Sequence, residues 1–120
     1  MGNLIIRPRR LRVSAGVRAM VRENTLDAGD MIFPLFVVPG SNVRQEIPAM
    51  PGNYHLSPDM AVQSAQEAYE LGIPAVLLFG LPEYKDAIGS SAWDANSPVQ
   101  QAVRRIKAVL PDLVVITDVC

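Results

Sequence analysis

The sequence has little of several features that would point to particular classes of protein. It contains one cysteine in 120 residues, so no disulfide can form within the chain, and a reducing compartment is the natural assumption. No stretch approaches the roughly 18 apolar residues of a membrane span, and the first residues lack the long apolar core of a signal peptide. The sequence therefore predicts a cytoplasmic protein with no membrane partner.

A strong net charge is also missing. The 11 Lys and Arg residues are balanced by 12 Asp and Glu residues, which gives a net charge of −1 and no overall electrostatic reason to bind nucleic acid. Arg7, Arg9, Arg10 and Arg12 form a local basic cluster, but no aromatic residues are interleaved with them. We predict no nucleic-acid partner. With 49% hydrophobic and 19% charged residues, the chain has the composition of a globular domain or part of one.

Residues 1–30 differ from the rest and are predicted to form an extended amino-terminal arm. They are basic and contain no long apolar run. Val13 to Glu23 could hold a short helix with Ser14 as its cap, although Gly16 weakens it. Because such a segment has too little apolar surface to fold alone, we expect it to rest on another surface.

Strands and helices alternate from residue 31 onward. Continuous apolar runs of strand length predict buried strands at 31–38, 75–80 and 113–119. Pro34 interrupts the first run and cannot donate a backbone hydrogen bond, so it predicts a bulge or an unpaired edge there.

Two amphipathic helices separate these strands. The first is predicted to begin at Ser57, which serves as its cap, and to end at Gly72. The second is predicted to begin at Ser97 with a capping box between Ser97 and Gln100, and to stop before Pro111.

Loop lengths favour one α/β architecture over another. The connections that follow the first two strands, 39–56 and 81–97, are long, whereas the turns that lead from helix to strand are short. This asymmetry is typical of a (β/α) barrel, with a doubly wound sheet as the rival. A complete barrel needs about 250 residues. We therefore predict that residues 31–120 hold the first three strands and two helices of a TIM (β/α)8 barrel, and that the chain is the front of something larger.

The candidate site lies at the end of the third predicted strand, where Asp118 and Cys120 stand two positions apart. Functional residues of α/β proteins gather at the carboxyl ends of the strands, and thiolate is a soft ligand suited to Zn²⁺. Each residue also has a simpler interpretation, since Asp118 could cap the following loop and Cys120 could fill a core. His55 is predicted to lie in a loop, and Lys85 to be solvated or structural.

Several short segments together resemble a known family, and the resemblance runs the whole length of the chain. They resemble porphobilinogen synthase, also called 5-aminolevulinate dehydratase, in their order and spacing. The matching segments are 7–12, 33–37, 50–52, 72–76, 79–80, 85–86, 89–90 and 117–120.

The resemblance implies an activity and a metal. Members of the family condense two molecules of 5-aminolevulinate to porphobilinogen in tetrapyrrole (heme) biosynthesis, and the two active-site lysines that they use would lie beyond residue 120. In zinc-dependent members the third strand runs into a Cys-x-Cys segment that is followed by a third cysteine. Cys120 matches the first of these ligands, and Asp118 matches the catalytic aspartate beside the metal. The resemblance thus implies Zn²⁺ as cofactor and leaves Mg²⁺ open as another metal.

The resemblance also implies a quaternary structure. The family's arm wraps a neighbouring subunit. We therefore expect residues 1–30 to contact another subunit in a homo-oligomer, specifically an octamer. Two interpretations of the 120 residues remain open. They are either the first third of an enzyme, inactive without the missing lysines, or a non-catalytic assembly module that binds a full-length partner.

Overall fold

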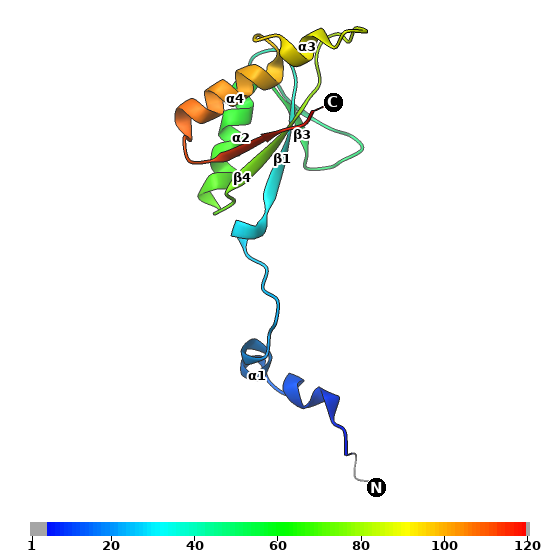
Figure 1. Ribbon diagram of the computed structural model, residues 1–120, viewed down its shortest axis with the longest axis vertical. Helices are drawn as coiled ribbons and strands as arrows, with labels where there is room; N and C mark the ends of the chain where they lie inside the picture. The colour runs from blue at the N-terminus through cyan, green and yellow to red at the C-terminus, as the bar shows by residue number, and fades with distance from the viewer. Residues whose placement is uncertain (1–4, 120) are drawn as a thin grey trace.

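The computed structural model describes residues 5–119, which form an extended arm followed by a compact α/β body (Figure 1). The arm holds two 3-10 helices and one short α-helix, and the body holds five strands and three α-helices. The elements of the arm are η1 (Pro8–Arg12), α1 (Ala15–Met20) and η2 (Ala28–Asp30). The elements of the body are β1 (Ile32–Val37), β2 (Arg44–Glu46), β3 (Tyr54–Leu56), α2 (Pro58–Glu70), β4 (Ala75–Gly80), α3 (Ser90–Trp93), α4 (Pro98–Val109) and β5 (Val114–Thr117).

The sheet has the order β2-β3-β1-β4-β5, and all neighbouring strands are parallel except β2 and β3. The three predicted strands correspond to β1, β4 and β5, and the two predicted helices to α2 and α4. The predicted burial was wrong for β5, whose four residues are exposed or half-buried because no helix covers one face of the sheet. The structure does not confirm the count of three strands and two helices, because it contains two further strands and one further helix. β2 and β3 lie inside the stretch 39–56 that was predicted to be a loop, and α3 lies inside the loop 81–97.

The two missed strands are short and owe their conformation to pairing. Each is three residues long, and all of β2 is exposed. β3 pairs with β1 through Phe36↔His55 and Val37↔Leu56, and Arg44 of β2 lies over the ring of Tyr54, with its guanidinium carbon 4.2 Å from the ring centroid. Because these contacts join distant parts of the chain, the local apolar pattern indicates the two strands only weakly.

Pro34 lies at an unpaired edge, as predicted. The amide of Val38 donates to Leu56 on β3, whereas the carbonyl of Val37 accepts from Leu81 on the β4 side. Backbone groups of successive residues in a strand point to alternate sides, so the nitrogen of Pro34 faces the β3 side. On this side β3 pairs only with Phe36 and Val37. Because no described strand lies opposite Pro34 there, its missing N–H donor costs no hydrogen bond between described strands.

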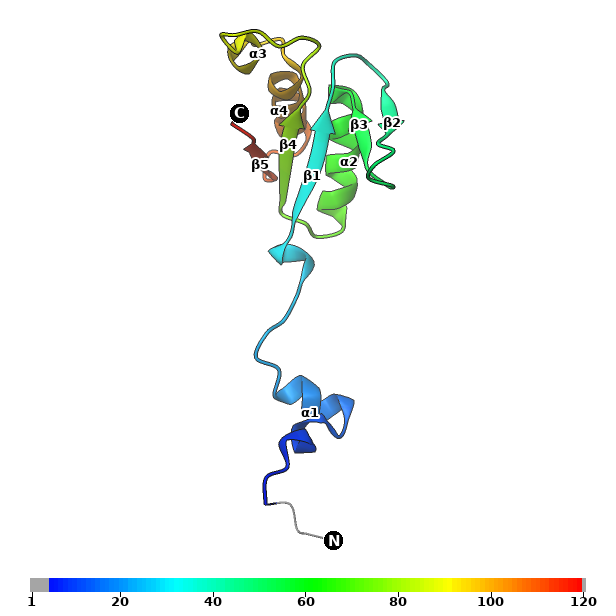
Figure 2. The same ribbon diagram turned by 90° about the vertical axis from the view of Figure 1, so that its right-hand side faces the viewer.

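The core lies between one face of the sheet and the helices α2 and α4. Figure 2 looks onto the opposite face of the sheet, with both helices behind the strands. Leu35 and Val37 of β1 and Leu78 of β4 are buried on the helix side. α2 contributes the small residues Ala61 and Ala65, which let the helix approach the strands closely. The remaining buried core residues are Leu56, Val76, Ala102, Ile106 and Leu113.

The arm extends away from the body, and the Cα trace measures 73 × 30 × 25 Å along its principal axes (Figure 1). The predicted helix exists as α1, and the hydroxyl of Ser14 accepts a hydrogen bond from the amide of Val17 at 3.2 Å, as an N-cap should. None of the residues in η1 or α1 is buried. The described part of the arm, residues 5–30, therefore has no core of its own.

Candidate active site at the carboxyl ends of the strands

The register of the sheet places Asp118 in a row with two phenylalanines. Phe36 of β1 pairs with Phe79 of β4, and Leu78 pairs with Thr117 of β5. Asp118 follows directly, and its amide donates to the carbonyl of Leu78 at 3.2 Å, which keeps it beside β4 after β5 has ended. Side chains alternate between the two faces of a sheet. Asp118 therefore belongs with Phe36 and Phe79 on one face of the sheet. The helices leave this face of the sheet uncovered (Figure 2).

The two phenylalanines form an aromatic wall next to this carboxylate. Their ring centroids are 5.4 Å apart and the ring planes are inclined by 20°, which is a stacked arrangement. Both rings are half-buried, whereas Asp118 is exposed. A substrate on this face would meet apolar surface over β1 and β4 and a carboxylate at the end of β5.

His55 extends the same row. It pairs with Phe36 and stands on the uncovered face, although it was predicted to lie in a loop. That prediction was wrong because β3 is held by its pairing with β1 and β2. The alternation of apolar and polar residues in Tyr54-His55-Leu56 was a signal for this strand, but it spans only three residues.

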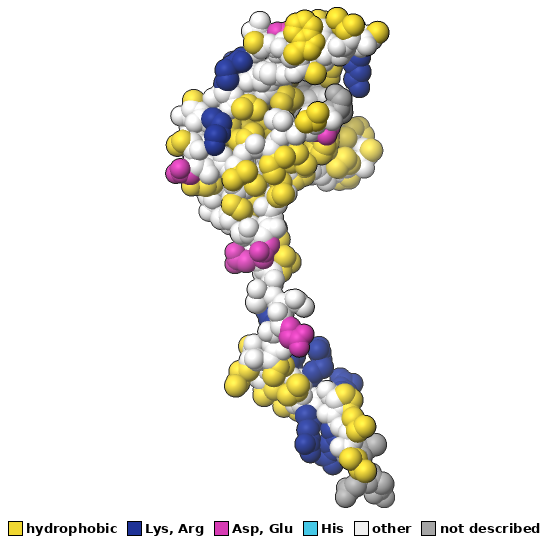
Figure 3. All heavy atoms as spheres, in the orientation of Figure 1, with side chains coloured by type: hydrophobic (Ala, Val, Ile, Leu, Met, Phe, Trp, Pro, Cys, Tyr) yellow, Lys and Arg dark blue, Asp and Glu magenta, His cyan; other side chains and the backbone are white. Residues whose placement is uncertain are grey.

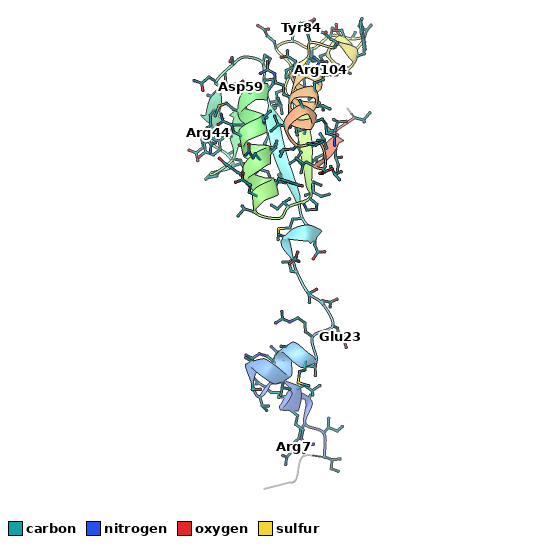
Figure 4. The ribbon with its side chains drawn as sticks, turned by 90° about the vertical axis from the view of Figure 1, so that its left-hand side faces the viewer. Arg7, Glu23, Arg44, Asp59, Tyr84 and Arg104 are labelled. Carbon is teal, nitrogen blue, oxygen red and sulfur yellow. The ribbon has the colours of Figure 1, made fainter. Side chains whose placement is uncertain are left out.

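The loop after β1 is tied to the first turn of α2. The hydroxyl of Ser57 accepts a hydrogen bond from the amide of Val43 at 2.9 Å, and no side-chain cap on α2 itself is formed. Asn42 has a positive φ of 56°, and its amide donates to Asp59 at 2.8 Å. The nearby Ser57 hydroxyl and the hydrogen bond from the Asn42 amide hold the pKa of Asp59 below its ordinary value. Figure 4 shows Asp59 at this end of α2.

The loop after β4 is organised in a similar way. Asp86 accepts hydrogen bonds from the amide and the hydroxyl of Ser90, which begin α3 and lower the pKa of Asp86. Gln100 was predicted to cap α4 together with Ser97, and this was wrong. Its amide nitrogen instead donates to the carbonyl of Ala92 at 2.6 Å, so that α4 holds α3 in place. Lys85 is exposed in this loop, as predicted.

The fold and the row beside Asp118 can be compared with known proteins. The model of the delta-aminolevulinic acid dehydratase family matches residues 5–120. The chain belongs to this family. The resemblance seen in the sequence is thereby confirmed.

Individual members of the family agree along the chain. The chain is 52% identical over 115 residues to the delta-aminolevulinic acid dehydratase of Synechocystis. The aligned residues cover 96% of this chain and 35% of the relative. The chain is 51% identical over 114 residues to the dehydratase of Halalkalibacterium halodurans, covering 95% and 35%. The chain thus spans about a third of the length of these relatives.

A solved structure supports the same assignment. The chain superposes with a TM-score of 0.90 and 31% identity on the delta-aminolevulinic acid dehydratase (porphobilinogen synthase) of Toxoplasma gondii in complex with porphobilinogen, covering 97% of this chain and 33% of that one. The mixed α/β body with its five-stranded sheet is therefore part of a porphobilinogen synthase fold.

No group of metal ligands is assembled within the described residues. Cys120, the predicted zinc ligand, lies outside residues 5–119, and within that range no three His, Cys, Asp or Glu side chains form a group that could hold a metal ion. In donor chemistry the chain fits zinc, since it offers a thiol two residues after a carboxylate. Cys120 would supply one of the three cysteines that the family resemblance implies.

None of the helices in residues 5–119 is long and apolar enough to cross a membrane. The longest, α2, has 13 residues.

Proposed function

We propose that the protein represented by this chain condenses two molecules of 5-aminolevulinate to porphobilinogen, as a porphobilinogen synthase of tetrapyrrole biosynthesis in the cytoplasm. The family match over residues 5–120 carries this proposal. In the complete enzyme β1, β4 and β5 would be the first three strands of a TIM barrel, with residues 31–120 as the amino-terminal part of the catalytic domain. The long loops at their carboxyl ends agree with that arrangement.

Asp118 is the catalytic residue of the proposal. Its position after the end of β5, exposed and beside the Phe36–Phe79 pair, supports this role. A carboxylate at that place can accept hydrogen bonds from the amino group of 5-aminolevulinate and can take up a proton during the condensation.

Cys120 is proposed as the first of three cysteine ligands to Zn²⁺. When bound, zinc would act as a Lewis acid on a substrate oxygen or lower the pKa of a bound water. The supporting observation is the spacing Asp118-Val119-Cys120 directly after a strand. Mg²⁺ is the other metal of the proposal, for which the described residues give no ligand group.

The arm, residues 1–30, is proposed to contact a neighbouring subunit in a homo-octamer. Six arginines and no acidic residue lie between residues 5 and 22, and Figure 3 shows these cationic side chains grouped on the arm. Apolar side chains are also exposed there, including Ile6, Met20 and Leu26 at 79%, 87% and 79%.

Deleting residues 1–13 from the full-length protein should lower its sedimentation coefficient by more than the lost mass explains. A sedimentation coefficient that changes only as the lost mass predicts would refute the proposed role of the arm in assembly.

The 120 residues alone are proposed to be inactive, because neither lysine can serve as the Schiff-base nucleophile. Lys85 is exposed in the loop after β4. The amino group of Lys107 donates to the carbonyls of Pro111 and Leu113 at 2.7 and 2.8 Å, which lie before the amino end of β5. It is therefore held at the opposite end of the sheet from Asp118.

A colorimetric pyrrole assay tests the proposal. The full-length protein should form porphobilinogen from 5-aminolevulinate, lose this activity when a chelator removes zinc, and regain it when zinc is restored. Absence of the pyrrole product from metal-loaded protein would refute the function. Undiminished activity in zinc-free protein would refute only the assignment of Cys120 as a zinc ligand.

A further inference from the structure

The Phe36–Phe79 pair connects β1 with the surface next to Asp118. Phe79 is the neighbour of Asp118 in the row, since Leu78 pairs with Thr117 one residue earlier. Phe36 is one strand further from Asp118. With neighbouring strands about 4.8 Å apart, Phe36 lies roughly 10 Å from the carboxylate, and its contact with the site runs through Phe79.

The ring of Phe36 has a defined place. Its strand is fixed on both sides at this level, by Phe79 on β4 and by His55 on β3. Residues that flank it in the sequence, Leu35 and Val37, are buried against the helices, which anchors the backbone that carries the ring. Phe36 therefore stands on a strand that is paired on both sides, whereas β4 ends one residue beyond Phe79.

We propose that Phe36 is a positioning residue for the condensation, because its ring stacks on Phe79 and fixes the aromatic surface next to Asp118. This inference rests on the proposed function. A substrate with a chain of methylene groups, such as 5-aminolevulinate, would pack on the Phe79 ring while its polar groups meet Asp118. Without the second ring, Phe79 could take other side-chain orientations, and the substrate would be held less well in line with the carboxylate.

The test compares three variants of the full-length protein that contains this sequence. Phe36→Leu removes the stack, and Phe36→Tyr keeps an aromatic ring. Phe33→Leu is the matched control, because Phe33 lies on the same strand but on the helix-covered face, 36% exposed. Circular dichroism checks the folding of each, and Phe36→Met, which is unbranched and adaptable, replaces Phe36→Leu if that variant does not fold.

Steady-state kinetics with 5-aminolevulinate give the decisive readout. Phe36→Leu should lower kcat/KM by about tenfold with a clear rise in KM, whereas Phe36→Tyr and Phe33→Leu should remain within about twofold of wild type. A purely structural role would lower kcat in proportion to the folded fraction and leave KM unchanged, and that result would overturn the inference. Equal losses in Phe36→Leu and Phe36→Tyr would overturn it as well. Wild-type protein that makes no porphobilinogen would overturn the proposed function, and this inference with it.

Discussion

At the scale of single residues, Gly80 shows how closely α4 packs on the end of β4. A Cβ added at this position would overlap Cγ2 of Val99 on α4. Valine is stiff about χ1, so the helix rather than the side chain would have to move.

Gly80→Ala should therefore lower the free energy of unfolding of the full-length protein by about 1–3 kcal/mol, measured by denaturant titration. Gly16→Ala is the control, because its added Cβ would meet only the Ser14 hydroxyl at 4.0 Å, and alanine favours the helix. Equal stability of Gly80→Ala and wild type would show that α4 does not contact β4 this closely.

Asp59 gives a second prediction at this scale, one that depends on pH. Its pKa in the folded protein lies below the ordinary value because the nearby Ser57 hydroxyl and the Asn42 amide favour the charged form. A lowered pKa contributes stability that is present above the unfolded value of about 3.9 and is lost as the pH falls through the folded value. The stability difference between wild type and Asp59→Asn should thus be constant near neutral pH and shrink below about pH 4. A difference that stays constant from pH 7 to pH 3 would contradict it.

At the scale of elements, the sequence predicted those segments whose own residues determine them. β1, β4 and β5 are continuous apolar runs, and α2 and α4 begin with Ser-Pro and carry one apolar face. β2 and β3 escaped prediction because their stability comes from pairing with each other and with β1 rather than from their composition.

Side-chain hydrogen bonds at the starts of the helices were also hard to predict from the sequence. Ser97 and Gln100 have the spacing of a capping box, yet the Gln100 amide reaches Ala92 across a loop that the sequence does not place. Among the candidate site residues, Asp118 directly follows β5, as the sequence predicted, whereas Cys120 lies outside the described residues, and the roles of both stay predictions. The positions of His55 and of the Phe36–Phe79 stack were not predictable, since only the register brings them into the row with Asp118.

Gln100→Ala tests whether α4 holds α3. Loss of its hydrogen bonds to Ala92 and Ser91 should speed amide exchange of residues 90–94 by about tenfold, since one or two hydrogen bonds are worth about 1–2 kcal/mol. Exchange within α4 should be unchanged. Gln66→Ala, which removes only an exposed contact with Glu70, is the control. Unaltered exchange at residues 90–94 would mean that α3 is held by other contacts.

At the scale of the whole molecule, charge and apolar surface are distributed unevenly. The arm carries six arginines and exposed apolar side chains, whereas residues 31–120 hold five basic and nine acidic residues. Such a basic arm is suited to an acidic surface, and the proposed octamer would bring it to the body of another subunit. The uncovered face of the sheet, which carries Phe36, Phe79 and Asp118, is the side on which the proposed barrel would enclose its substrate.

The most direct test of this account measures porphobilinogen formed from 5-aminolevulinate by the full-length protein and by its Asp118→Asn variant, both loaded with zinc. Asn preserves the size of the side chain and removes its charge and its capacity to take a proton. The wild type should form the pyrrole, and Asp118→Asn should lower kcat by about 10²-fold or more while folding normally. Equal rates for the two proteins, or no pyrrole from either, would contradict the account.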